Sequence, residues 1–523
     1  NSIASGGNYN VVVGDEAGTA LTTGDDNVAV GYAALATEDG NGKNTAVGSQ
    51  ALQTLNAGAD AYNVAVGYQA GNDLTSGIQN TLIGGLAGDV LTDADYNVAV
   101  GVSALGADTK GNKSVAVGYS ALTAQNFTSS TDTLNTAVGY QAGAAVTTGL
   151  NNTLIGALSG DAITDADYNT AVGAGTLSTN VLGSGSTAMG FNVLYNQNPA
   201  SAVSMYNTAY GYAAASQLST GIQNTLIGGL AGDALTTSNY NVAVGYNAAG
   251  SSTTGDSNSV LGRQALFSNT TGSNNVAVGR DALEANTTAD DNTAVGFHAL
   301  VTNTTGHSNV AVGKFALRYN TTGQENTALG SMALITNTTA SDNVAVGRQT
   351  MYANTTGAQN TALGAYALDA STTGLDNVAL GYSALGDNTT ASYNTAVGRS
   401  ALVYNTTGAS NTAVGYKAGY SNTTATEMTA VGIEALYSNT TGNTNSALGR
   451  RALYSTTTGV NNAGFGARTL YTNTTGSYNV SIGMDSLYSN TTASNNTAVG
   501  YFALYANTTG TRNVAVGASS LDA

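Results

Sequence analysis

An asparagine recurs every 17 residues along most of this 523-residue chain, for example at Asn275, Asn292 and Asn309. We count 30 repeats between Asn10 and Asn513, with the consensus N-[TV]-A-V-G-Y-x-A-L-x-x-N-T-T-G-x-x. A fixed period of this length is the signature of a solenoid, in which each repeat forms one coil that stacks on the next. Positions in the repeat are numbered here from this asparagine, and residues at one position of successive coils form a column.

Residue preferences indicate that the coils are built from β-structure. A helix–turn–helix repeat needs about 34 residues, whereas Val and Thr favour strands and turn residues recur in every coil. The sequence therefore predicts an all-β fold, a parallel β-solenoid or β-roll of about 30 coils with a 17-residue repeat. A strand around Val276 to Val278 would alternate its side chains, and we expect its second and fourth positions to face inward. We also expect a second strand near the seventh to tenth positions, burying pairs such as Ala299 and Leu300.

Three positions carry a specific backbone or hydrogen-bonding expectation. The fifth position is Gly in every coil, from Gly14 to Gly517, which predicts a tight bend or a close backbone approach that any Cβ would obstruct. The N-T-T-G segment is typical of a type I turn, and Ala replaces its Gly in some coils, so a positive φ is not expected there. The first-position asparagines are expected to form a ladder of amide hydrogen bonds along the stack.

The first half of the chain carries a longer period. Near-identical segments begin at Asn80, Asn152 and Asn224, 72 residues apart. Insertions lie within residues 53–62, 123–134 and 195–206. We therefore predict a head-like solenoid with insertion loops over residues 1–257 and a uniform, shaft-like solenoid over residues 258–523.

Insertions in a solenoid project from one face, which is often the binding face. The candidate binding residues in these loops are Asn126, Phe127, Asn196, Pro199 and Met205. The alternative is loop variation tolerated after segmental duplication.

Composition excludes several classes of function. The net charge is −17, from 31 acidic and 14 basic residues, so duplex nucleic acid and anionic membranes would be repelled. No apolar run approaches the ~18 residues of a membrane helix, and we expect no membrane insertion. With no Cys and only His298 and His307, no convergent catalytic or thiolate set is available. We expect a non-enzymatic protein without a cofactor.

Calcium is a weak cofactor candidate, because carboxylate oxygens are its preferred ligands. The acidic residues concerned occur in two copies of the long repeat: Asp89, Asp93, Asp95, Asp161, Asp165 and Asp167. The third copy has Thr237 and Asn239 in place of two of these acids. The alternative reading is a solvated acidic turn.

Two polar features of the repeat could also carry function. Thirteen N-T-T segments fit the N-glycosylation pattern, although the turn alone explains their period; they begin at Asn269, Asn286, Asn303, Asn320, Asn337, Asn354, Asn388, Asn405, Asn422, Asn439, Asn473, Asn490 and Asn507. Tyr recurs at the tenth position, for example at Tyr437 and Tyr454. Such a stripe would either bind glycans or stack across coils and stiffen them.

The repeat resembles two known families. Its NVAVG core, as at Asn27, Asn63, Asn97 and Asn241, looks like the head repeat of YadA-type trimeric autotransporter adhesins. The longer NTTGxxNTAVGYxA pattern beginning at Asn405 resembles repeats in tail-fibre-domain proteins of phages and bacteria. The resemblance implies a left-handed β-roll that forms a homotrimer, although 17 residues exceed the usual adhesin-head repeat.

Together these observations predict a structural or adhesive extracellular fibre at a cell surface or on a virion. Its expected partners are further copies of itself and a cell-surface glycan or protein receptor. One alternative is a filament subunit that polymerises head to tail through uncapped solenoid ends. The other is an ice- or surface-binding solenoid that uses Thr ladders at the second, thirteenth and fourteenth positions.

Overall fold

A computed structural model describes residues 6–522 and confirms the predicted fold class: an all-β parallel solenoid of about 30 coils. The chain divides into two compact units, Asn1–Arg263 (unit 1) and Gln264–Ala523 (unit 2). The predicted boundary after residue 257 lies close to this division, while the head and shaft roles and the handedness stay predictions. Across residues 6–522 there is no helix with the length and apolarity needed to cross a membrane.

Unit 1 contains fifteen three-residue strands that form one sheet, and four two-residue strands. The sheet strands are β1 (Val11–Val13), β2 (Val28–Val30), β3 (Thr45–Val47), β4 (Val64–Val66), β5 (Thr81–Ile83), β6 (Val98–Val100), β8 (Val115–Val117), β10 (Thr136–Val138), β11 (Thr153–Ile155), β12 (Thr170–Val172), β14 (Thr187–Met189), β16 (Thr208–Tyr210), β17 (Thr225–Ile227), β18 (Val242–Val244) and β19 (Ser259–Leu261). The short strands are β7 (Gly111–Asn112), β9 (Thr131–Asp132), β13 (Gly183–Ser184) and β15 (Val203–Ser204).

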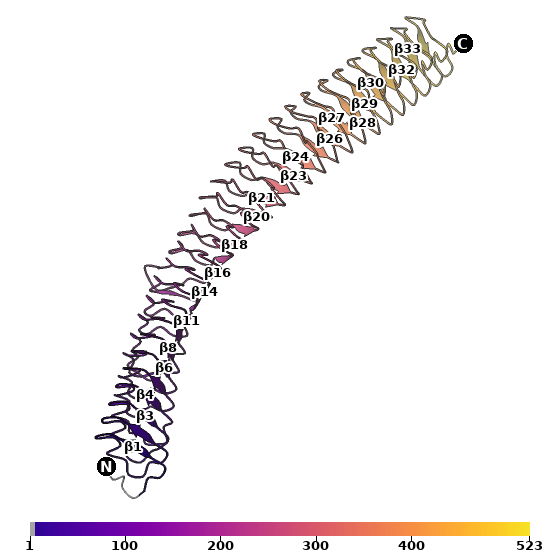
Figure 1. Ribbon diagram of the computed structural model, residues 1–523. Helices are drawn as coiled ribbons and strands as arrows, with labels where there is room; N and C mark the ends of the chain where they lie inside the picture. Colours follow the sequence, from indigo (N-terminus) through magenta and orange to yellow (C-terminus); the bar gives the residue numbers. More distant parts are fainter. Residues whose placement is uncertain (1–5, 523) are drawn as a thin grey trace. The chain divides into compact units, whose positions relative to one another are not determined.

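Unit 2 contains fifteen strands of the same kind without short additions among its described residues. They are β20 (Val276–Val278), β21 (Thr293–Val295), β22 (Val310–Val312), β23 (Thr327–Leu329), β24 (Val344–Val346), β25 (Thr361–Leu363), β26 (Val378–Leu380), β27 (Thr395–Val397), β28 (Thr412–Val414), β29 (Thr429–Val431), β30 (Ser446–Leu448), β31 (Ala463–Phe465), β32 (Val480–Ile482), β33 (Thr497–Val499) and β34 (Val514–Val516). Figure 1 shows these strands side by side along the unit, one per coil.

Neighbouring coils pair in parallel and in strict register. In unit 2, for example, Val276 lies beside Thr293 and Ala277 beside Ala294. The insertions of unit 1 leave this register unchanged, because Val115 still pairs with Thr136 across a coil that is four residues longer. Each column of the sequence is therefore a physical column in the fold.

The inward face of the strand is opposite to the expected one. The third-position Ala277 is fully buried, whereas Val276 and Val278 on either side are only partly buried. At Gly464, which replaces this Ala in one coil, an added Cβ would lie 2.3 Å from Leu453 Cδ1. The third position therefore packs against the ninth-position Leu, and a small residue is needed there because the Leu fills the core.

The expected second strand is also wrong. The seventh to tenth positions form successive turns, and the ninth-position residues Leu283 and Leu300 have φ of 52° and 51°. This left-handed conformation costs a non-glycine residue about 1–2 kcal/mol, which complete burial of the leucine offsets with about 1.5–3 kcal/mol. The turn still bonds to the next coil, because Leu283 N–H donates to the Ala299 carbonyl at 3.0 Å.

The left-handed ninth position explains why several coils of unit 1 have Gly there. Gly71 has φ of 59°, and an added Cβ would lie 2.7 Å from Leu82 Cδ1 of the following coil. In these coils the core volume comes instead from a larger third-position residue such as Leu82 and a twelfth-position residue such as Leu74, both buried. The repeated NTLIG segments therefore fill the same core with different positions: the third and twelfth residues are large, and the ninth is Gly.

The fifth-position glycines confirm the expected close approach. Gly313 has φ of 134°, and an added Cβ would lie 2.6 Å from the carbonyl carbon and oxygen of Gly330 in the next coil. Those neighbours are backbone atoms, which cannot move aside without separating the coils. Only glycine combines this φ with that contact.

Substitution of Gly313 by Ala should therefore open the solenoid locally. Strain at this φ costs about 1–3 kcal/mol before the backbone clash is added, so we expect amide protection in the adjoining coils to fall by roughly a hundredfold. Hydrogen exchange of the full chain measures this loss. Gly386→Ala is the matched control, because its Cβ would meet no atom closer than 3.4 Å. Equal protection in the two variants would contradict the role assigned to the glycine column.

Candidate functional site

The first-position asparagines form the expected ladder. Asn292 N–H donates to Asn275 Oδ1 at 3.1 Å, and Asn309 Nδ2 donates to Asn292 Oδ1 at 3.2 Å. A third bond closes each coil, as Asn275 Nδ2 donates to the Ala289 carbonyl at 2.9 Å. Because these amides are buried, each one would leave an unsatisfied polar group if it were removed.

A second asparagine ladder, which the sequence alone did not suggest, runs along unit 2 at the twelfth position. Asn303 Nδ2 donates to Asn286 Oδ1 at 3.1 Å and to the Gly306 carbonyl at 2.8 Å. The second bond spans the N-T-T-G turn, so a side-chain amide holds this turn. As expected from its replacement by Ala, Gly306 does not have a positive φ.

This ladder contains the candidate glycosylation residues. Twelve of the thirteen are buried: Asn269, Asn286, Asn303, Asn320, Asn337, Asn354, Asn388, Asn405, Asn422, Asn439, Asn473 and Asn490. Asn507, in the last complete turn, is half-buried. A glycan on any of the twelve amide nitrogens would require its coil to open.

Some candidate binding residues of the insertion loops are buried and others are exposed. Phe127, Pro199 and Met205 point inward and are buried, while Asn126 is exposed and Asn196 half-exposed. The other exposed parts of the 123–134 loop are Thr128 to Ser130, Asp132 and Leu134. Each long loop is anchored to the preceding coil by a small parallel ladder, β7 with β9 and β13 with β15.

A buried polar network lies under the first long loop. Gln125 Nε2 donates to Asp108 Oδ2 at 2.6 Å and to Ser114 Oγ at 2.8 Å, and Phe127 N–H donates to Asp108 Oδ1 at 3.1 Å. Burial raises the pKa of the Asp108 carboxyl. The signal in the sequence is a coil that starts with Ser and has Gln at its twelfth position.

The same substitution recurs under the second long loop. There Gln197 Nε2 donates to Ser186 Oγ at 3.1 Å, and Asn207 Nδ2 donates to Gln197 Oε1 at 3.0 Å. These networks connect the loops to the core and hold their bases in place.

The candidate calcium ligands have structural partners of their own. Asp95 and Asp167 accept backbone N–H groups of the preceding coil, at 2.8 Å from Ile78 and 2.7 Å from Leu150. Asn239 accepts the equivalent bond in the third copy at 2.9 Å, since only an oxygen is needed.

The remaining four acids are dispersed. Asp93 lies 3.7 Å from Lys110 Nζ, Asp161 accepts a bond from Ser178 Oγ at 2.6 Å, and burial raises the pKa of Asp89. Asp165 accepts a bond from the Thr164 hydroxyl at 3.0 Å. Residues 6–522 contain no group of three or more acidic or His side chains placed to hold a metal ion.

The two histidines occupy separate surroundings. His298 Nε2 lies 3.2 Å from Asp281 Oδ2 in the seventh column, whereas the exposed His307 contacts Ser308. The seventh column also holds cross-coil ion pairs, of which Arg451 with Glu434 at 2.6 Å is one. His298 therefore belongs to a set of charged contacts between coils.

The tyrosine stripe is a stacked ladder. From Tyr420 through Tyr437, Tyr454, Tyr471, Tyr488 and Tyr505 the ring centroids are 4.9–5.2 Å apart and the planes differ by 6–17°. Each ring face is covered by its neighbour, so a sugar would meet ring edges and hydroxyls. This geometry matches cross-coil stiffening better than glycan stacking.

The three Thr columns differ in how their hydroxyls are used. At the thirteenth position the hydroxyl is committed to the next coil, as Thr287 Oγ1 donates to the Thr304 carbonyl at 3.0 Å. At the fourteenth position, for example Thr288, the side chain is exposed. Second-position Thr residues such as Thr293 lie on the outward face, where Val alternates with them.

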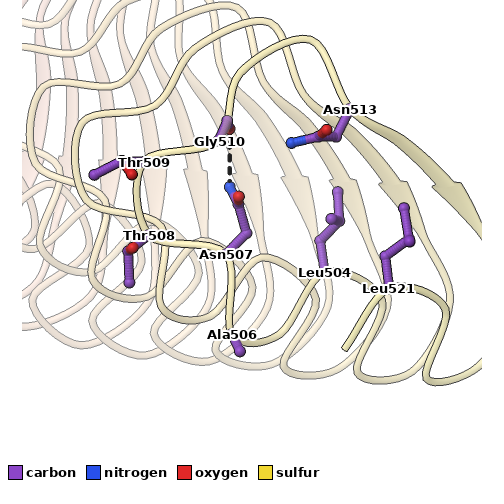
Figure 2. A pocket seen from close by; sticks show the side chains of 8 residues that line it. All are labelled: Leu504, Ala506, Asn507, Thr508, Thr509, Gly510, Asn513 and Leu521. Carbon is purple, nitrogen blue, oxygen red and sulfur yellow. Dashed lines mark hydrogen bonds between the residues drawn. The ribbon is translucent and has the colours of Figure 1, made fainter. Parts of the chain in front are cut away.

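A hollow of about 380 Å³ lies at the last coil of unit 2. Figure 2 shows Asn507 and Asn513, one from each ladder, together with Leu504 and Leu521. The hollow exposes core leucines and the two ladder amides, which are the groups through which each coil contacts the following one. Its chemistry is that of the coil-to-coil contact.

Two comparisons with known proteins give no match. No protein-family model matches the chain, and no curated protein is similar to it. The YadA-type and tail-fibre resemblances therefore remain expectations that rest on the repeat motif.

Asp369 should make stability depend on pH. Burial, with a smaller effect of the Asp387 charge, raises its pKa to about 6. Because this lies above the unfolded value of about 3.9, stability should increase as the pH falls through 6 and gain nothing further below about 4. For a half-exposed group we expect about 1 kcal/mol after solvent screening.

The urea midpoint of the full chain at about pH 7 and pH 5 measures this gain. Asp369→Asn should unfold at higher urea at the upper pH and show a smaller pH response. Asp522→Asn removes the same charge from an exposed position and serves as control. If both variants respond to pH like the native chain, Asp369 is not the responsible group.

Proposed function

We propose that the chain is a structural and adhesive fibre, carried on a cell surface or a virion, that attaches to other surfaces and works as a homotrimer. Support for a structural role comes from the columns: backbone contacts at the glycines, two asparagine ladders and stacked tyrosines repeat from coil to coil. Such nearest-neighbour bonding is typical of stiff repeat proteins.

The insertion loops are the single observation that favours attachment. They interrupt an otherwise regular scaffold, expose segments such as Thr128–Ser130, and are held at their bases by the Asp108 and Gln197 networks. Each of the three coils with an insertion ends with a large side chain that lies on the surface: Tyr62, Leu134 and Tyr206 are each more than half exposed. A variable loop on a rigid support is a common arrangement for recognition.

The charge of unit 1 limits the kind of receptor. Unit 1 contains 18 acidic and four basic residues, whereas unit 2 contains 13 acidic and ten basic residues. Like charges on facing surfaces oppose association. We therefore propose a neutral glycan or a protein surface as the partner, in preference to a sulfated or sialylated glycan.

Attachment through the loops can be tested by substitution. The full chain carrying Leu134→Ser and Tyr206→Ser should bind target cells at least about tenfold more weakly, because each of these exposed side chains would contribute on the order of 1.5–3 kcal/mol when the target buries it. Tyr319→Ser with Tyr352→Ser, exposed in the regular coils, is the matched control. Native binding by the loop variant would exclude the loops, and polymers that grow with concentration would instead favour the head-to-tail filament.

A Thr-based ice or surface binder is the second candidate, favoured by the exposed fourteenth column, which is Thr in fifteen consecutive coils from Thr271 to Thr509. We expect no thermal hysteresis, because the thirteenth-position hydroxyls are donated to carbonyls and the outward second column mixes Thr with Val. Measurable hysteresis in a nanolitre osmometer would revive this candidate.

A further inference from the structure

The outward face of the unit 2 sheet is uncharged and uncovered by the described part of its own unit; its fourth column is apolar in every coil, and its second column mixes Val with Thr. Its second and fourth columns, over β20 to β34, contain no charged residue. Leu329, Leu363 and Leu448 in the fourth column are 45%, 50% and 50% exposed. Parallel sheets are normally covered on both faces, and contiguous apolar patches of several hundred Å² mark interaction sites.

The face is large enough for a stable interface. Fifteen strands about 4.8 Å apart extend for about 70 Å. From the seventeenth to the sixth position the chain spans about 20 Å in the other direction. The resulting area of roughly 1,400 Å² exceeds the ~800 Å² per partner of a standard protein–protein interface.

Opposite charges line the two edges of this face. After each strand, at the sixth position, unit 2 has the exposed bases Arg280, Lys314, Arg348, Arg399 and Arg450 and no acid. Before each strand, at the seventeenth position, it has the exposed acids Asp291, Glu325, Asp342, Asp376 and Glu427, with Arg512 the one base.

Most of these edge charges are free for an outside partner; among the five bases, Arg280 is paired within its own coil, with its Nε 2.9 Å from Asp281 Oδ2. Lys314, Arg399 and Arg450 take part in none of the ion pairs within residues 6–522, and neither do the five acids. Arg348 contacts the Tyr366 hydroxyl and lies over that ring. Acid and base on one chain are about 20 Å apart, which is too far for them to neutralise each other.

The charges of the two edges match to within one strand. Asp342 and Arg348 flank the same strand, β24. Each of the other four bases lies one strand from an acid: Arg280 beside β20 with Asp291 before β21, Lys314 beside β22 with Glu325 before β23, Arg399 beside β27 with Asp376 before β26, and Arg450 beside β30 with Glu427 before β29. All five bases therefore have a complementary charge at nearly the same height on the opposite edge.

From this match we infer that the outward face of unit 2 binds a second copy of the same chain, parallel and in register. The basic edge of one chain then lies along the acidic edge of its neighbour, and the second and fourth columns are covered between them. An antiparallel pair would place base against base and acid against acid. The contact joins unlike edges, and it rests on the self-association included in the proposed function.

Neutralising the basic edge should weaken the association. In sedimentation experiments on the full chain at about 50 mM NaCl, we expect Arg348→Gln with Arg399→Gln and Arg450→Gln to raise the dissociation constant on the order of tenfold. The control is Thr356→Glu with Thr407→Glu and Thr458→Glu, which gives the same net charge on the exposed fourteenth column and should leave the constant unchanged. An equal effect of both sets, or a native chain that stays monomeric, would overturn the inference.

Direction and register can be tested by cross-linking, because the chain has no Cys. A chain with Ser331→Cys at the sixth position should form a disulfide with a chain carrying Ser308→Cys, one strand away on the other edge. Ser410→Cys lies several strands further along and should not react. Preferential reaction with Ser410→Cys would reject the parallel register. A chain that attaches through its loops but remains monomeric would refute this inference alone and leave the attachment proposal standing.

Discussion

The backbone contact at the fifth-position glycines sets the geometry of the whole chain. The glycine of one coil lies against the backbone of the glycine in the next, so the coils approach at the spacing that hydrogen-bonded strands require. That spacing lets side chains in several columns contact their counterparts one coil away. The asparagine ladders, the tyrosine stack and the ion pairs of the seventh column all depend on it.

Within this fixed spacing the core is filled in two ways. Unit 2 mostly combines a small third residue, a left-handed Leu at the ninth position and an Asn at the twelfth, as in Ala277, Leu283 and Asn286. Several coils of unit 1 use a large third residue, Gly at the ninth and an aliphatic residue at the twelfth. The exchange conserves volume, as close-packed interiors require, and it replaces a polar ladder by an apolar one. The two fillings explain much of the sequence difference between the units.

Most of the features that the sequence predicted correctly follow from its 17-residue period. It identified the solenoid, the register, the glycine contact and the first asparagine ladder, because each follows from identical residues being stacked. It did not reveal which face of a three-residue strand points inward, since Val276 and Val278 are more apolar than Ala277 and the packing partner Leu283 lies in a turn. The left-handed leucines and the second ladder at Asn303 were missed for a related reason: turn geometry is decided by tertiary packing, and N-T-T-G also fits an ordinary turn. The buried position of Phe127 and Met205 likewise depends on the network beneath the loops.

The sameness of the coil-to-coil contact has a genetic consequence. Loss or gain of one regular coil by recombination between neighbouring repeats would join two surfaces that already fit each other, because Asn and Gly columns continue across the new junction. The solenoid could thus change length over generations while every intermediate sequence keeps the same stacking contacts. In the proposed lateral pairing, a lengthened chain would match copies of its own length along every coil but not the shorter parental chains.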